Sequence, residues 1–87
     1  MIYKLIESYM LKLKPRDVEM FARENGFNLT AEETSIFYDT IKKKWYNIIY
    51  NDPKPIFEEL KPKLNPQTYK KAEELFFYFK NKYQRFL

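Results

Sequence analysis

The chain has 87 residues and contains no cysteine and no histidine. These two absences exclude disulfides, cysteine or histidine catalysis and the usual zinc sites. There is one glycine, so the glycine-rich phosphate loops, nucleophile elbows and calcium loops are missing as well. The adjacent carboxylates Glu58–Glu59 and Glu73–Glu74 project about 100° apart on a helix and are interpreted as surface charge. The sequence therefore predicts a protein that is not an enzyme and needs no cofactor or metal ion.

Long apolar runs are also absent. The uncharged run WYNIIY is far shorter than the ~20 apolar residues that a spanning helix needs, so we expect no membrane span. The N-terminal stretch MIYKLIESYMLKLK mixes charged with apolar residues and has no continuous apolar segment of a secretory signal. We therefore expect a cytoplasmic protein. Its net charge of +4 permits contact with nucleic acid, although lysine-rich composition is more often a matter of solubility.

Apolar positions recur at spacings of three and four, which is typical of helices. This pattern predicts an all-α fold: a compact single-domain bundle, spanning residues 1–87, of four to five helices with short joints marked by proline and glycine. The expected helices cover residues 2–14, 15–25, 31–50 and 55–61, and a last helix begins at Pro66. For the first helix we expect one continuous apolar face, formed by Ile2, Leu5, Ile6, Tyr9, Met10 and Leu13.

The stretch ENGFNLTAEE has the form of a helix-turn-helix joint. Ala22 and Gly26 have the spacing that a DNA-reading turn requires, but the acidic Glu32 and Glu33 would lie where the second helix approaches phosphates. An ordinary helix corner is therefore the favoured interpretation. In it Gly26 ends the second helix in a left-handed conformation, and Thr30 with Glu33 forms a capping box for the third.

The last helix carries an apolar stripe at alternating spacings of three and four residues, formed by Tyr69, Ala72, Phe76, Phe79, Tyr83 and Phe86. A coiled-coil seam and the central helix of a small bundle both fit this pattern. The short length and the many aromatic residues favour the central helix. Phe77 falls on the polar side of the same helix and Tyr78 on the margin of its stripe, while Ile36 falls outside the stripe of the third helix. These three residues are the candidate contacts with a protein partner.

Lysines form the second group of candidate contacts. Lys42, Lys43 and Lys44 are consecutive, and Lys70 and Lys71 lie near the start of the last helix. Three consecutive helical residues spread over about 200°, so the favoured interpretation is a solvated face. If the fold brought the two groups together, they would form a surface for a phosphate backbone.

The segments PRDVEMFARENGFNLTAEE, WYNIIYND and NPQTYKKAEELFFYFKNKY resemble, in this order, a family of small uncharacterised proteins of spore-forming Gram-positive bacteria known only as a domain of unknown function. The resemblance implies a compact helical cytoplasmic protein and transfers no functional residue. The leading hypothesis is thus a non-enzymatic protein that binds another protein or itself. The alternative is a nucleic-acid-binding module with a lysine-rich surface.

Overall fold

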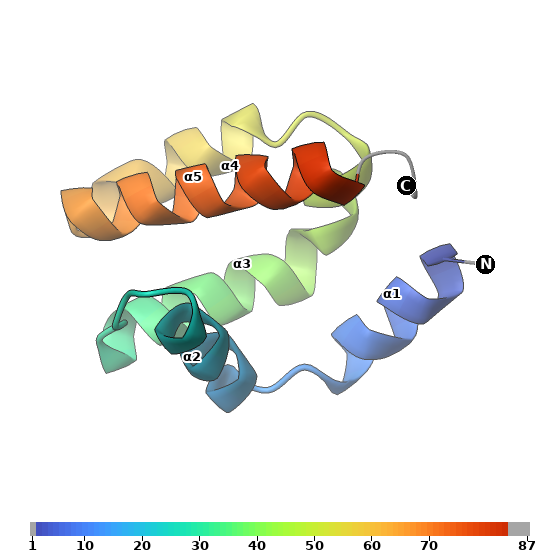
Figure 1. The fold of residues 1–87 in the computed structure, drawn as a ribbon, viewed down its shortest axis with the longest axis horizontal. Coiled ribbons are helices and arrows are strands. Elements are labelled where there is room, and N and C mark those ends of the chain that lie inside the picture. Colours follow the sequence, from blue (N-terminus) through green and yellow to red (C-terminus); the bar gives the residue numbers. More distant parts are fainter. Residues whose placement is uncertain (1, 84–87) are drawn as a thin grey trace.

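The structure, a computed structural model, describes residues 2–83, and within them the chain forms five α-helices, one 3-10 turn and no strand (Figure 1). The helices are α1 (Ile2–Lys12), α2 (Pro15–Glu24), α3 (Ala31–Tyr50), α4 (Lys54–Leu60) and α5 (Pro66–Tyr83), and the 3-10 turn η1 (Lys61–Lys63) follows α4. The predicted all-α bundle is confirmed. The predicted position Phe86, and the side chains of Ile2 and Tyr83, lie outside the part of the chain that is described.

Helix α3 is the middle element of the bundle. Figure 1 shows α1 and α2 on one side of α3 and α4 and α5 on the other. The expectation that the last helix is central is wrong, because no side chain between Pro66 and Lys82 is fully buried. The stripe of α5 faces α3 across a gap, which is described below. The radius of gyration, 12.5 Å, is close to the ~12 Å of a folded chain of this length.

The joint between α2 and α3 has the predicted local structure. Gly26 has φ of 92°, and the Phe27 amide donates to the Ala22 carbonyl at 3.0 Å, which closes the end of α2. At the start of α3, the Glu33 amide donates to Thr30 Oγ1 at 3.0 Å and the Thr30 amide donates to Glu33 Oε1 at 3.2 Å. Ala22 is only 2% exposed, so its small side chain lets α2 approach α3 closely.

Helix α1 is shorter and less covered than predicted. It ends at Lys12 because Lys14 precedes Pro15 and has the extended conformation that a following proline favours (φ −121°, ψ 157°). Leu5 and Tyr9 are 68% and 62% exposed, so the predicted apolar face of α1 is only partly covered in the structure. Among the described elements α1 packs mainly on α3, and one neighbouring helix covers only a narrow stripe of its surface.

The best-buried apolar cluster lies on the far side of α3, where Ile56, Leu60 and Leu64 are each less than 9% exposed. Ile36 and Tyr69 pack against this cluster from α3 and α5. Helix α4 begins at Lys54 rather than at 55, and its last turn continues into η1, which includes Pro62. Helix α3 has a bend at Lys44 (φ −129°, ψ 15°), between the segment that packs on α2 and the segment that packs on α1.

Candidate functional site: an aromatic seam over an apolar pocket

The three predicted partner contacts lie against three different neighbours. Ile36 is half-buried against the Ile56 cluster, so the expectation that it is left outside the core is wrong, and packing within the chain accounts for its apolar side chain. Phe77 is 46% exposed, with its ring stacked 6.4 Å from that of Phe57 on α4. Tyr78 is 55% exposed, with its ring 5.3 Å from that of Phe79. The structure therefore does not bring the three residues into one patch.

Tyr78 belongs to a different patch, which we call the aromatic seam and define as Phe21, Tyr78 and Phe79. The rings of Phe21 on α2 and Phe79 on α5 are 5.7 Å apart and tilted by 42°. Because the next residue of α2, Ala22, faces α3, Phe21 projects to the side and reaches α5. Phe21 is nevertheless 47% exposed, so two of the three rings present large apolar areas to solvent. The sequence analysis named Tyr78 as a candidate contact but did not predict that Phe21 and Phe79 lie beside it.

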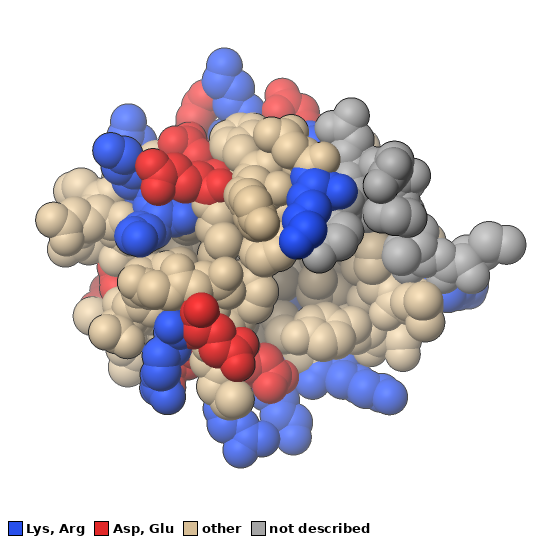
Figure 2. Space-filling view, in the orientation of Figure 1, with Lys and Arg blue, Asp and Glu red and all other residues tan. Residues whose placement is uncertain are grey.

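The seam lies on the face shown in Figure 2, where α2 and α5 are nearest the viewer. Uncharged side chains cross the middle of this face, and lysine, arginine and acidic side chains lie both beside them and at the margin (Figure 2). The Lys82 ammonium lies 5.7 Å from the centre of the Tyr78 ring, so the seam has a cation at its edge. Exposed aromatic rings with polar groups around them are typical of protein interfaces.

The chain also exposes more surface than its mass predicts. Its accessible surface is 6495 Å², whereas a folded monomer of 10.8 kDa has about 5,500 Å² by the usual scaling with mass. Among the described residues, the large apolar side chains that are exposed are Leu5, Tyr9, Leu11, Met20, Phe21, Tyr46, Phe77 and Tyr78.

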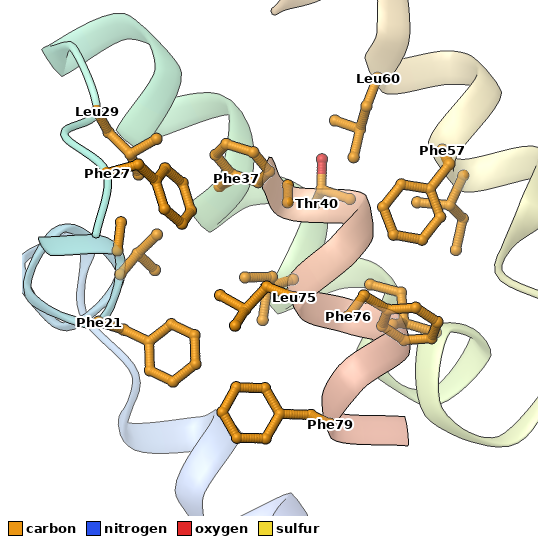
Figure 3. Close-up of a pocket in the computed structure, with 16 residues that line it drawn as sticks. Phe21, Phe27, Leu29, Phe37, Thr40, Phe57, Leu60, Leu75, Phe76 and Phe79 are labelled. Carbon is orange, nitrogen blue, oxygen red and sulfur yellow. The ribbon is translucent and has the colours of Figure 1, made fainter. Parts of the chain in front are cut away.

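Behind the seam lies an apolar pocket of about 270 Å³, the first pocket (Figure 3). Its walls come from α2, α3, α4, α5 and the joint that carries Phe27 and Leu29. Phe21 and Phe79 point toward each other at one edge of it, and Leu75 lies between them and the aromatic side chains of the opposite wall. Of the lining side chains within residues 2–83 that the structure describes, only that of Thr40 carries a polar atom. Water would therefore find few hydrogen-bond partners in this pocket.

A second pocket of about 320 Å³ adjoins the first. Both pockets are lined by Ile41, Ile48, Phe76 and Phe79, so these four side chains lie between them. The second pocket adds Met10 from α1 and Trp45 from α3, and Lys80 is the one charged side chain among its described lining residues. A dry cavity of the first pocket's volume alone would lower stability by about 6 kcal/mol, at ~24 cal/mol per Å³. That is comparable with the whole free energy of unfolding of a small domain.

Helix α5 is tied to α3 by a hydrogen bond that the sequence did not indicate. Glu33 is 7% exposed, and while its Oε1 caps α3, its Oε2 accepts the amide of Asn65 at 3.2 Å. Asn65 in turn accepts the Gln67 amide at 2.9 Å and begins α5, as predicted. One carboxylate thus links the starts of α3 and α5. A capping box predicts the hydrogen bonds between Thr30 and Glu33, but it does not predict the one between Glu33 and Asn65.

Two of the three consecutive lysines are engaged within the chain. Lys42 Nζ donates to the carbonyls of Met10 and Leu11 at 2.8 and 2.9 Å, at the C-terminal end of α1. Lys44 Nζ lies 3.1 Å from Glu59 Oε2 on α4, and this hydrogen bond lowers the pKa of Glu59. Both contacts hold other helices against α3. Because their ammonium groups are engaged in these contacts, Lys42 and Lys44 are less available to bind a phosphate backbone.

The other predicted phosphate contacts, Lys43, Lys70 and Lys71, are exposed. Near them, Lys61 Nζ lies 5.8 Å from the ring of Tyr69, whose hydroxyl donates to Glu73 at 3.2 Å. Partial burial and the Glu73 charge raise the pKa of Tyr69, so this tyrosine stays protonated near neutral pH. The acidic side chains in residues 2–83 form no group of three that would hold a metal ion. No helix in the same part of the chain is long and apolar enough to cross a membrane.

Comparison of the chain with protein-family models, with curated proteins and with solved structures finds no match in any of the three. The resemblance to a small helical family therefore stays a prediction. Any function has to be argued from the aromatic seam, the two pockets and the charges around them.

Proposed function

We propose that this is a small cytoplasmic, non-enzymatic protein that works by protein–protein association, and that its first partner is a second copy of the same chain. The observation that carries the proposal is the aromatic seam. Phe21 and Tyr78 are about half exposed and lie on either side of Phe79, at the junction of two helices. Tyrosine and phenylalanine are enriched in interfaces, where they bury large areas with few rotatable bonds.

Most homodimers are isologous, meaning that the same patch on both copies meets across a two-fold axis. The seam offers such a patch, because its rings come from two helices and Phe21 on α2 of one copy can meet Tyr78 on α5 of the other, and the reverse.

Charge predicts how this association depends on salt. Each copy carries a net charge of +4, so two copies repel each other at long range. Added salt screens this repulsion, and dimerisation through an apolar seam should become stronger as salt rises from low to moderate concentration. Binding of lysines to a phosphate backbone has the opposite dependence and becomes weaker.

Sedimentation equilibrium over a range of protein and salt concentrations tests the proposal. We expect a reversible dimer, and we expect Phe21→Ser and Tyr78→Ser each to raise its dissociation constant about 30-fold, as truncation of an aromatic anchor at an interface does. Leu11→Ser is the matched control, because Leu11 is 75% exposed but lies on α1, away from the seam. A monomer at all concentrations would refute the proposal, as would a dimer weakened equally by all three substitutions.

A further inference from the structure

We propose that the two adjoining pockets form a binding site for a single fatty carboxylate, whose alkyl chain enters the first pocket and whose head group lies near Lys80. The inference rests on the volume, the lining and the charge of the pockets. It does not require self-association: Phe21 and Phe79 belong both to the seam and to the first pocket, but Tyr78 lines neither pocket and so tests the dimer alone.

The lining selects for an alkyl chain. All but one of the described side chains around the first pocket are hydrocarbon or aromatic, and an apolar lining of this kind favours apolar molecules over water. A methylene group fills about the ~30 Å³ that liquid water allots to each molecule, so 270 Å³ accommodates roughly nine methylenes. The site therefore fits a medium-length chain, and the chain end reaches the second pocket past Phe76 and Phe79.

The charge selects for an anionic head group. Among the residues that the structure describes, Lys80 is the only charged one that lines either pocket, and its Nζ lies 5.7 Å from the centre of the Phe76 ring. Among the described residues, its ammonium group forms no ion pair with a carboxylate. Its side chain is half-buried, which weakens the screening of its charge. A carboxylate at the end of the alkyl chain would supply the missing partner.

The chain provides its own reporter for this site. Trp45 lines the second pocket and is the one tryptophan of the sequence, so its fluorescence should respond when a ligand displaces water there. We would titrate the full chain with octanoate, decanoate, dodecanoate and tetradecanoate below their micellar concentrations, and measure stoichiometry by calorimetry. The expected result is one molecule bound per chain, with affinity rising about fourfold per methylene up to a chain that fills the pocket and then levelling off.

Two pairs of variants test separately how the head group and the alkyl chain of the ligand contribute to binding. Lys80→Gln should weaken dodecanoate binding about tenfold and leave dodecanol binding unchanged, whereas Lys70→Gln removes the same charge from an exposed position of α5 and should change neither. Ala72→Leu places a larger side chain in the first pocket and should weaken binding of every chain length. Ala31→Leu makes the same change at an exposed alanine and should not.

Several results would overturn the inference. These are absence of saturable binding in the unmodified chain, affinity that does not depend on chain length, and equal binding of dodecylammonium and dodecanoate. Sedimentation with phospholipid vesicles in place of binding to free dodecanoate would point to a membrane surface and would equally refute it. Tyr78→Ser should bind dodecanoate like the unmodified chain, so a failure of the dimer proposal and a failure of this one can be told apart.

Discussion

Replacing Ala72 by leucine should stabilise the protein, which is the opposite of what enlarging a side chain in a filled core does. Ala72 lies on the half-buried face of α5 and lines the first pocket. Leucine adds three carbon atoms, and each apolar carbon removed from water contributes about 0.8 kcal/mol, so the expected gain is about 2 kcal/mol. The loss in helix propensity is a few tenths of a kcal/mol at most. In a domain of this size the gain corresponds to a rise in Tm of about 10 °C.

Urea and thermal unfolding, followed by far-ultraviolet circular dichroism, measure this gain. The matched control is Ala31→Leu, which makes the same change at an exposed alanine in the first turn of α3 and should alter stability by less than about 0.5 kcal/mol. A filled core would instead be overpacked by the leucine and lose about 1–3 kcal/mol. Destabilisation by Ala72→Leu, with the control unchanged, would therefore refute the claim that the space beside Ala72 is unfilled.

Four further substitutions test other parts of the structure by the same unfolding measurements. Glu33→Ala leaves two backbone amides without their acceptor and should cost about 2–3 kcal/mol, whereas loss of a local cap alone would cost ~1 kcal/mol. In Gly26→Ala the added Cβ has no neighbouring atom within 4 Å, but the residue must keep φ at 92°. We expect a destabilisation of ~1 kcal/mol from backbone strain alone. An unchanged stability would contradict the left-handed conformation. The buried Tyr50 hydroxyl has no hydrogen-bond partner among the described residues, so Tyr50→Phe should not destabilise, and a loss above ~1 kcal/mol would reveal a missed partner. The hydrogen bond from Lys44 lowers the pKa of Glu59 in the folded state below its ordinary value of 4.5. The ionised Glu59 therefore stabilises the fold above pH 4.5, and this stabilisation is lost as the pH falls through the folded-state pKa. Glu59→Gln should flatten that part of the curve of stability against pH.

The parts of the fold that depend on neighbours in the sequence could be predicted. The capping box of Thr30 and Glu33, the left-handed Gly26 and the start of α5 at Asn65 each depend on residues within about five positions, and each occurs as expected. Helix ends near proline were less certain, since Pro15 restricts the residue before it and so shortened α1. Local chemistry therefore placed the helices and their joints.

The sequence did not predict which face of each helix packs against which neighbouring element. A helical wheel shows that Phe77 and Tyr78 project in different directions, but it does not say that one meets α4 and the other lies on the seam with α2. The second carboxylate oxygen of Glu33 and the ammonium of Lys42 act on elements about thirty residues away. An apolar stripe likewise has the same pattern whether it faces a filled core or a pocket, as the half-buried stripe of α5 illustrates.

Dilution of the protein, followed residue by residue through the chemical shifts of its amides in NMR spectra, tests the proposed interface most directly. The account predicts that shifts near Phe21 on α2 and near Tyr78 on α5 change together with protein concentration and follow one dimerisation curve. Shifts near Leu11 on α1 should stay constant. Shifts that do not change with concentration, or that change on α1 and not across the seam, would contradict the proposal that this chain pairs through its aromatic seam.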